Sequence, residues 1–292
     1  MRILITGKNS YIGEQIQAYL QSFGYNVSVV DTISDEWNEV DYSQFKCVIH
    51  VAAIVHQNAK DASEDLFVKV NSNLPFSIAE LAKQNGVKQF VFLSSMGVYG
   101  KTKSLSPEET VIDCNTVPSA VGGYGGSKLA AERRLTDLAD EYFSVAFVRP
   151  PNVYGPGCRG NYISLFKKLA LTLFICPDIY REIRQSMLYI DNLSELIRLI
   201  IEKNSSGVFL PQDDEIPNTV ELITKIRQLF GKTTVTSKFL GGFLRLFHRM
   251  SLVKKIYGGI HYDKQSSDAF DYKYQVVCFD EGIKRTYREK YK

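Results

Sequence analysis

The chain has 292 residues, of which 35 are Lys or Arg and 32 are Asp or Glu, so its formal net charge is only +3. A charge this close to zero excludes a protein whose main task is to coat nucleic acid. Apolar residues make up 45% of the chain, which excludes a disordered or fibrous protein. A chain of this length predicts one large globular domain or two closely joined ones.

The apolar segments and cysteines limit the compartment and the kind of site. Residues 1–7 leave no room for the apolar region of a secretory signal, and the longest apolar stretch, near 169–176, falls far short of the ~18 residues of a membrane span. We therefore expect a cytoplasmic protein without a transmembrane segment. The five cysteines are scattered and form no C-x-x-C pair, so neither a disulfide framework nor a zinc site is expected.

Short β-branched segments alternate with segments of helical period in the first half of the chain. The predicted strands are 3–6, 26–30, 47–51, 89–94 and 144–149, and the predicted helices between them are 11–23, 66–84 and 124–142. This alternation is typical of buried parallel strands joined by crossover helices. We therefore predict an α/β fold with a doubly wound parallel sheet over residues 1–155.

Prolines interrupt the alternation after Arg149, and the predicted helices become shorter, near 162–171, 193–203 and 219–230. This pattern predicts a smaller, mostly helical lobe over 156–292, with some segments returning to the first domain. The two lobes would share a cleft at the carboxyl ends of the strands, where open α/β sheets bind ligands.

The first predicted strand leads into a glycine-containing turn, ITGKNSYIG, at residues 5–13. Gly7 would make the tight turn, Gly13 would let the helix pack closely on the sheet, and backbone N–H groups at the helix start would hold a pyrophosphate. Ser10 stands where the usual fingerprint has its middle glycine. The residues predicted to bind a dinucleotide here are Gly7, Ser10, Tyr11, Ile12 and Gly13.

Asp31 ends the second predicted strand, 18 residues after Gly13. A carboxylate at this place accepts hydrogen bonds from the adenine ribose hydroxyls and repels a 2′-phosphate. Residues 32–34 supply no arginine that would neutralise such a phosphate, so the sequence favours NAD over NADP. The alternative interpretation is that Asp31 is only a turn residue at a strand end.

Tyr124 and Lys128 stand at i and i+4 in YGGSK and would lie on one helical face. An ammonium group one turn away stabilises a phenolate, so the pair could exchange a proton with a substrate hydroxyl. Gly125 and Gly126 each cost a helix about 1 kcal/mol relative to Ala, which indicates close approach of another backbone or of a ligand.

A second hydroxyl-bearing segment, SSMGVYG at residues 94–100, closes the fourth predicted strand. It would place Ser94 and Ser95 at the ligand edge of the sheet. A hydroxyl there can donate a hydrogen bond to a carbonyl that forms opposite Tyr124.

Taken together, these motifs resemble those of the extended short-chain dehydrogenases/reductases of the nucleotide-sugar epimerase and dehydratase family. The resemblance covers roughly the whole chain and is most pronounced to bacterial enzymes of capsule and exopolysaccharide sugar biosynthesis. It implies a Rossmann-type fold, bound NAD, a UDP-linked sugar substrate and a homodimer. The matching motifs, in chain order, are ITGKNSYIG, Asp31, HVAA (50–53), Asn71, SSMGVYG, YGGSK, RPPNVYGPG (149–157) and LYIDNL (188–193).

The resemblance also implies roles for the matching residues. Tyr124 would be the general base, Lys128 would bind the nicotinamide ribose and lower the Tyr124 pKa, and Ser95 would hold the reacting oxygen. The further cofactor contacts that it implies are Asp41 near the adenine, Ala52, Ala53, Asn71, Ser94 and Pro150. The substrate contacts that it implies are Ser95, Met96, Tyr124, Asn152 at the diphosphate, and Arg184.

Two positions depart from the family pattern. Dehydratase relatives carry an Asp-Glu pair directly after the catalytic hydroxyl, whereas this chain has Met96 and Gly97, so a 4,6-dehydratase is not expected. The phosphate-binding arginine of the family is replaced by Gln185. Arg184 or Arg181 would serve in its place after a shift in register.

Three hypotheses follow for the function. The leading one is an NAD-dependent nucleotide-sugar 4-epimerase, because a tightly held NAD suits a reaction without net redox change. The alternative is an NAD(P)H-dependent 4-ketoreductase of a UDP-4-keto-6-deoxy-N-acetylhexosamine, which would use the same three residues in one direction. The third is a non-catalytic NAD-sensing protein, although family members of that kind lack the tyrosine or the lysine.

A pair of histidines and a basic amphipathic segment are two further candidate sites. His50 and His56 are six residues apart without a third ligand nearby, so no metal site is expected. Residues 239–257 combine apolar residues at helical spacing with four basic ones. Such a basic amphipathic helix can lie on an anionic membrane surface, although packing against its own domain is the more common outcome.

Overall fold

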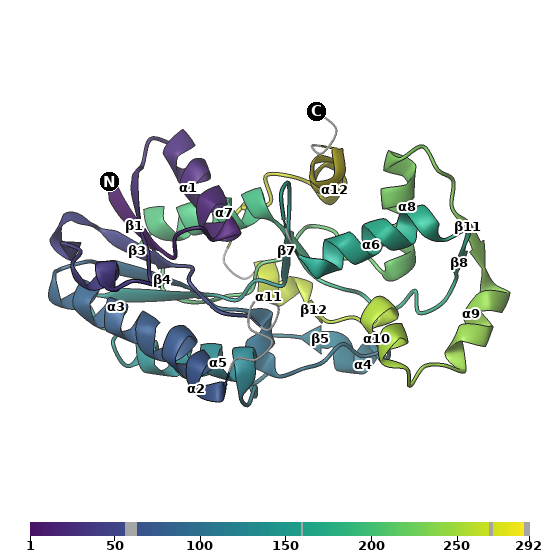
Figure 1. Ribbon diagram of the computed structural model, residues 1–292, viewed down its shortest axis with the longest axis horizontal. Helices are drawn as coiled ribbons and strands as arrows, with labels where there is room; N and C mark the ends of the chain where they lie inside the picture. The colour runs from purple at the N-terminus through teal and green to yellow at the C-terminus, as the bar shows by residue number, and fades with distance from the viewer. Residues whose placement is uncertain (56–62, 159, 269–270, 289–292) are drawn as a thin grey trace.

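Six parallel strands form the central sheet of the protein, in the order β10-β6-β4-β3-β1-β2 (Figure 1). The structure is a computed structural model that describes residues 1–55, 63–158, 160–268 and 271–288. The prediction of a doubly wound parallel sheet is confirmed. The strands are β1 (Arg2–Thr6), β2 (Asn26–Val30), β3 (Cys47–His50), β4 (Gln89–Leu93), β6 (Ser144–Val148) and β10 (Gly207–Phe209).

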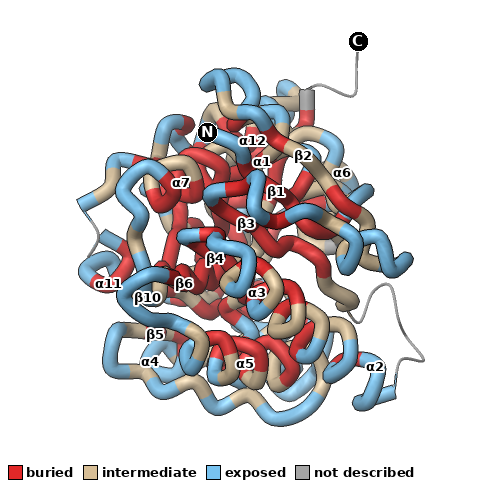
Figure 2. Tube along the Cα trace, turned by 90° about the vertical axis from the view of Figure 1, so that its left-hand side faces the viewer, coloured by how far each residue is buried: buried red, intermediate tan, exposed pale blue. Residues whose placement is uncertain are grey.

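Both faces of the sheet are buried, as Figure 2 shows by the band of buried strands between two helical layers. In β1, Ile3 and Ile5 pack into one apolar cluster, with residues of α1 (Tyr11–Ser22) and α7 (Ile190–Glu202). Leu4 points to the opposite face and packs with α3 (Leu74–Gln84) and α5 (Gly123–Thr136). Because both faces are covered, the central strands β1, β3, β4 and β6 are nearly continuous apolar runs, whereas the edge strands β2 and β10 are partly exposed.

Three helices differ in extent from the sequence prediction. The expected helix over 66–84 is divided into α2 (Glu64–Val68), a π-helical turn (Lys69–Asn73) and α3. The expected helix over 124–142 ends at Thr136, because the Asp140 carboxylate accepts hydrogen bonds from the next backbone N–H groups and closes a turn. The expected helix over 239–257 is wrong: α9 (Lys238–Arg245) and α10 (Ser251–Tyr257) are separate helices.

Most of the chain after β6 forms a lobe beside the carboxyl ends of the strands, on the right in Figure 1. Two of its elements, α7 and β10, return to the sheet and its cover. No helix in the described ranges is long and apolar enough to cross a membrane. The remaining helices are α4 (Pro107–Thr110), α6 (Asn161–Thr172), α8 (Thr219–Leu229), α11 (Lys264–Asp268) and α12 (Phe279–Arg288). The paired short strands are β5 (Val111–Ile112) with β12 (His261–Tyr262), β7 (Asn152–Tyr154) with β9 (Met187–Tyr189), and β8 (Ile175–Pro177) with β11 (Val235–Ser237).

Candidate active site

The turn after β1 lies at the switch point of the sheet, where the chain continues to β2 on one side and to β3 on the other. Gly7 has a φ of +120°, and a Cβ at this position would lie 2.8 Å from the backbone nitrogen of Ala52. A Cβ on Gly13 would lie 3.0 Å from the side chain of Val51. The two glycines therefore let the start of α1 sit directly against the end of β3, as the fingerprint requires.

The start of α1 and the end of β2 lie side by side, as expected for residues that would hold the pyrophosphate and the adenine ribose of a dinucleotide. The hydroxyl of Ser10 caps α1 by accepting a hydrogen bond from Gly13, while the first N–H groups of a helix have no acceptor inside it. The N–H of Gly7 donates to the carbonyl of Val30, which brings Asp31 next to this turn. One Asp31 oxygen accepts from the N–H of Ile33, so Asp31 is also the turn residue of the alternative interpretation.

Asn71 and Asp41, which were predicted to contact the cofactor, make side-chain hydrogen bonds to other residues of the protein. The side chain of Asn71 exchanges hydrogen bonds with the backbone of Ile54 and donates to the hydroxyl of Ser127, so it ties the loop that carries Ala52 and Ala53 to α5. The exposed Asp41 accepts hydrogen bonds from the two residues after Tyr42 and caps a short helical turn. Direct contact of these residues with a cofactor stays a prediction.

Ser95, Tyr124 and Lys128 meet at the carboxyl edge of the sheet. The hydroxyl of Ser95 hydrogen-bonds the Tyr124 phenol, which lowers the Tyr124 pKa, but burial raises this pKa by more. Lys128 is 1% exposed, and its Nζ donates to the carbonyl of Leu93 at 2.8 Å. Burial lowers the pKa of Lys128 to about 7. The residues predicted to be catalytic thus lie together, with Lys128 buried and Ser95 and Tyr124 half-buried.

The glycines after Tyr124 explain how α5 reaches the Ser95 turn. A Cβ on Gly125 would lie 2.5 Å from the carbonyl oxygen of Gly97, and one on Gly126 would lie 2.9 Å from the carbonyl carbon of Val121. The expectation of close approach by another backbone is therefore confirmed.

Ser94 and Met96 do not face the site as predicted. The Ser94 hydroxyl donates to the carboxylate of Glu132, which forms a buried ion pair with Arg149 at 2.5 Å. Met96 is buried in an apolar cluster, and its N–H donates to the carbonyl of Pro150. Through these contacts both residues join the ends of β4, β6 and α5 to one another. Glu132, four residues after Lys128, was missed by the sequence interpretation.

The predicted substrate residues differ in what they can offer. Asn152 on β7 is half-buried, and its side chain makes no hydrogen bond within the described ranges. Arg184 donates to the carboxylate of Glu221 at 2.6 Å and to the carbonyl of Ile216, so it supports the N-terminus of α8. Arg181 pairs with Asp178. Because both arginines are paired with carboxylates, the structure does not favour either one as the replacement for the phosphate-binding arginine of the family.

An unpartnered cation lies near the position of the replaced arginine. Among the described residues, Lys103 Nζ, Gln185 Oε1 and His261 Nδ1 are closed off from solvent without a hydrogen-bond partner. Backbone pairing of Ser104 with Gly259, and of Gln185 with Ile260, places their segments side by side. Nζ of Lys103 lies 4.2 Å from the ring centroid of Tyr162. No sequence motif marks Lys103, which is why it was missed.

The model of the NAD dependent epimerase/dehydratase family matches residues 3–208 of the chain. The chain belongs to this family. It is 27% identical to a UDP-glucose 4-epimerase of Vibrio cholerae, with 97% of this chain and 94% of the relative covered. It is 28% identical to the N-acetyl-alpha-D-glucosaminyl-diphospho-ditrans,octacis-undecaprenol 4-epimerase of Escherichia coli O157:H7, with coverage of 64% and 56%.

Solved structures show the same fold for this epimerase/dehydratase family member. A Thermotoga maritima UDP-glucose 4-epimerase with UDP-glucose has a TM-score of 0.72 at 21% identity and covers 98% of this chain and 97% of its own. The Bordetella bronchiseptica enzyme WbmG in complex with NAD has a TM-score of 0.75 at 20% identity and covers 100% and 94%. The family and the fold that the sequence motifs indicated are therefore confirmed.

His50 belongs to the core of this family member. Its Nδ1 hydrogen-bonds the hydroxyl of Thr6 at 2.8 Å, and its ring stacks near Phe90 and Phe92. Burial and the nearby Lys128 lower the His50 pKa well below its usual value. Within the described ranges, no three His, Cys, Asp or Glu side chains are grouped to hold a metal ion. His56 and Arg159 lie outside the described residues.

Proposed function

We propose that the protein is an NAD-dependent nucleotide-sugar 4-epimerase that interconverts UDP-glucose and UDP-galactose or their N-acetylated equivalents for polysaccharide synthesis. The observation that carries the proposal is the assembly of Ser95, Tyr124 and Lys128 at the switch-point edge of the sheet. The near full-length match to the Vibrio epimerase supports it. Asp31 supports NAD as the cofactor, since its carboxylate follows β2 beside the Gly7 turn.

The three side chains have different roles at the 4-hydroxyl of the sugar. NAD bound in this cleft would supply a hydride acceptor that returns the hydride to the opposite face of C4. Tyr124 takes the hydroxyl proton and gives it back, while Ser95 donates a hydrogen bond to the same oxygen. Because burial raises the Tyr124 pKa, the phenolate needs added positive charge, and the ammonium of Lys128 one helical turn away supplies part of it.

We further propose that Lys103 holds the diphosphate of the substrate. A buried ammonium without a counter-ion is costly, and an anion beside it removes that cost. Its neighbour Tyr162 lies in the first turn of α6, a helix whose N-cap, Gly160, has no side chain to cap it. The positive end of this helix dipole therefore adds to the charge of Lys103 at one place. This charge would replace that of the arginine missing at Gln185.

The Lys103→Met variant is expected to bind UDP-glucose about ten-fold or more weakly, with kcat nearly unchanged, because it loses a charged hydrogen bond made in the ground state and the transition state alike. Calorimetric titration of UDP-glucose into an inactive Tyr124→Phe background measures the affinity. The exposed Lys101→Met is the matched control in the same loop. Equal affinity of the Lys103 and Lys101 variants would remove Lys103 from the site.

The pH dependence of this binding gives a second readout. Burial and the nearby Lys255 lower the pKa of Lys103 to about 7, so its neutral fraction grows as the pH rises through that value. The affinity for UDP-glucose is therefore expected to fall from pH 6 to pH 9, since the charged form is the one that binds an anion. Lys103→Arg keeps its charge over this range and should flatten the profile. An unchanged slope in that variant would contradict the assignment.

The alternative function is a 4-ketoreductase acting on a UDP-4-keto-6-deoxy-N-acetylhexosamine. It is favoured by a relative, the GDP-6-deoxy-D-mannose reductase of Pseudomonas aeruginosa, which is 24% identical over 78% of this chain. Incubation with UDP-glucose and with UDP-N-acetylglucosamine, without added reductant, separates the two by NMR. A galacto product supports the epimerase. Its absence from both, with one reduced cofactor consumed per 4-keto sugar, would establish the reductase instead.

A further inference from the structure

The end of the molecule formed by residues 238–255 exposes an unusual amount of apolar surface. This segment, here called the α9–α10 face, comprises α9, the loop 246–250 and most of α10, at the far right of Figure 1. Phe239 is 84% exposed, Leu246 75% and Phe243 57%. Further exposed apolar side chains in the segment are Leu240, Phe247, Met250 and Leu252. Single exposed apolar residues are ordinary, but a contiguous group marks a surface that another apolar medium covers.

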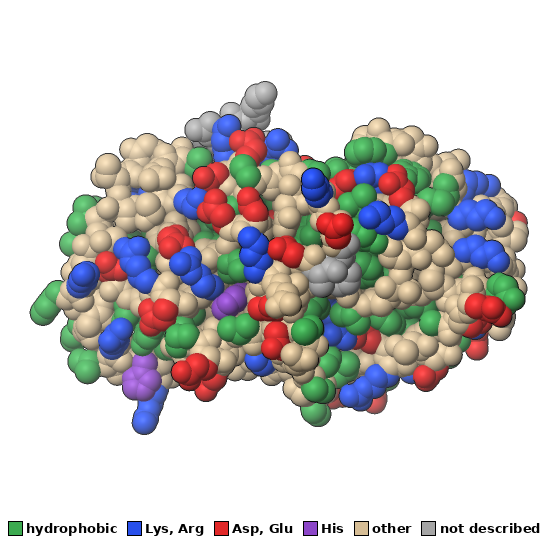
Figure 3. Space-filling view, turned by 180° about the vertical axis from the view of Figure 1, so that it is seen from behind, with side chains coloured by type: hydrophobic (Ala, Val, Ile, Leu, Met, Phe, Trp, Pro, Cys, Tyr) green, Lys and Arg blue, Asp and Glu red, His purple; other side chains and the backbone are tan. Residues whose placement is uncertain are grey.

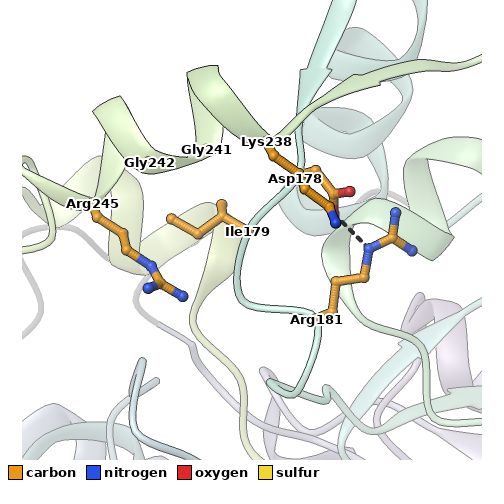
Figure 4. Close-up of a pocket in the computed structure, with 7 residues that line it drawn as sticks. All are labelled: Asp178, Ile179, Arg181, Lys238, Gly241, Gly242 and Arg245. Carbon is orange, nitrogen blue, oxygen red and sulfur yellow. Dashed lines mark hydrogen bonds and ion pairs between the residues drawn. The ribbon is translucent and has the colours of Figure 1, made fainter.

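The outward direction of these side chains is set by how α9 packs. Gly241 lies so close to the chain that a Cβ would collide with the carbonyl of Asp178. Lys238, Gly241, Gly242 and Arg245 share one side of α9 and line an open pocket of about 480 Å³ with Asp178 and Arg181 (Figure 4). Residues 239, 243 and 246 fall on the other side of a helix with 3.6 residues per turn. Gly241 is thus held against the protein, while Phe239, Phe243 and Leu246 face outward.

The α9–α10 face itself carries charge of one sign, and Asp178 at the pocket beside it is paired with Arg181. From residue 222 to residue 262 the chain has eight Lys or Arg residues and no Asp or Glu. Arg249, Lys254 and Lys255 are exposed within the α9–α10 face itself. Figure 3 shows this end at its left-hand edge, where hydrophobic and basic side chains lie together with acidic ones among them. A partner for this surface must therefore combine an apolar interior with negative charge.

We infer that the α9–α10 face docks the protein onto an anionic membrane surface. The aromatic and aliphatic side chains enter the boundary between headgroups and acyl chains, and the basic residues meet lipid phosphates, as in other helices that lie in the interface. A second copy of the chain fits less well, because a two-fold contact would place two basic surfaces opposite each other. The inference is independent of the proposed function, since attachment is measured without turnover.

The test is flotation of the full chain with vesicles of phosphatidylcholine, with and without phosphatidylglycerol. We expect binding to the anionic vesicles only, with release as salt is added. Arg249→Glu/Lys254→Glu should weaken binding by at least about twenty-fold, because each basic residue near the surface contributes roughly five-fold. Phe239→Ser/Leu246→Ser should weaken it by ten-fold or more, since about two buried apolar side chains are lost.

The controls are Tyr142→Ser, an aromatic residue that is 67% exposed, and Lys46→Glu, an exposed lysine directly before β3. Both lie outside the α9–α10 face and should leave vesicle binding unchanged, and thermal unfolding checks that every variant is folded. Wild-type protein that stays unbound, or controls that weaken binding as much as the face variants, would overturn the inference. Face variants that instead convert a dimer to a monomer, without vesicle binding by the wild type, would make the surface a contact between copies.

Discussion

The Tyr124→Phe variant is expected to lower kcat by roughly 10²- to 10⁴-fold, because it removes the hydroxyl that exchanges a proton with the sugar in the proposed mechanism. The substitution keeps the ring that packs against the Gly97 turn, so the fold of the site should persist. The hydrogen bond from Ser95 has no partner in this variant, but Ser95 Oγ still caps its turn by accepting from Gly97. The loss should therefore appear in kcat, with the affinity for UDP-glucose retained.

NMR measurement of initial epimerisation rates, on the UDP-sugar that the wild type converts, tests this expectation. Tyr142→Phe removes a phenol hydroxyl from an exposed position outside the site and should leave kcat within a factor of two or so of the wild type. Ser95→Ala should also lower kcat, by less than Tyr124→Phe, since it removes a hydrogen bond and not the proton carrier. An unaltered rate in Tyr124→Phe would exclude Tyr124 from the chemistry.

Glu132→Gln is expected to lower the free energy of unfolding by about 3–5 kcal/mol, because it leaves the buried guanidinium of Arg149 without its counter-charge. The two side chains of this pair are only 5% and 9% exposed. Arg149 donates to both carboxylate oxygens of Glu132 and to the hydroxyl of Tyr99, while Ser94 donates to Glu132. A neutral amide of the same shape cannot accept from all of these donors.

Urea unfolding measures the effect, with Glu281→Gln as the control at an exposed ion pair that should cost no more than about 1 kcal/mol. The double variant Glu132→Leu/Arg149→Met removes both charges and should be more stable than Glu132→Leu alone. If Glu132→Gln proves no more costly than Glu281→Gln, the ion pair does not stabilise the junction of β4, β6 and α5. Loss of stability in the double variant beyond the sum of the singles would also contradict the argument.

The features that were predicted from sequence are local ones. β1 and β2 were located because a strand buried on both faces is a short apolar run, whatever surrounds it. The start of α1 was expected at residue 11, and the Ser10 hydroxyl caps the helix there by accepting from Gly13. Tyr124 and Lys128 lie on one face of α5 because helix geometry alone relates i to i+4. Gly125 signalled a close neighbour, although its identity, the Gly97 carbonyl, came only from the structure.

The predicted ligand contacts that the structure does not favour involve side chains whose actual partners are far away in the sequence. The Ser94 hydroxyl donates to Glu132, 38 residues later, and Arg184 donates to Glu221, 37 residues later. Ser94 was predicted as a cofactor contact at the ligand edge, and Arg184 as a substrate contact. A hydroxyl or a guanidinium bonds whichever acceptor the folded chain brings near, and residue type does not reveal which one that is. Lys103 carries no motif at all, and its proposed role as an anion site rests on its burial beside Tyr162.

The sequence by itself therefore predicted the strand and helix pattern, the glycine turn after β1, the placing of Tyr124 and Lys128 on one helical face, and the family, because short-range geometry and side-chain chemistry suffice for these. Only the tertiary structure showed which polar side chains are hydrogen-bonded or ion-paired within the protein and which have no partner there. It also decided that α9 and α10 are separate helices, and that Phe239 and Phe243 of α9 face outward while Gly241 packs against Asp178. Burial and pairing are properties of the assembled chain, so no local pattern encodes them.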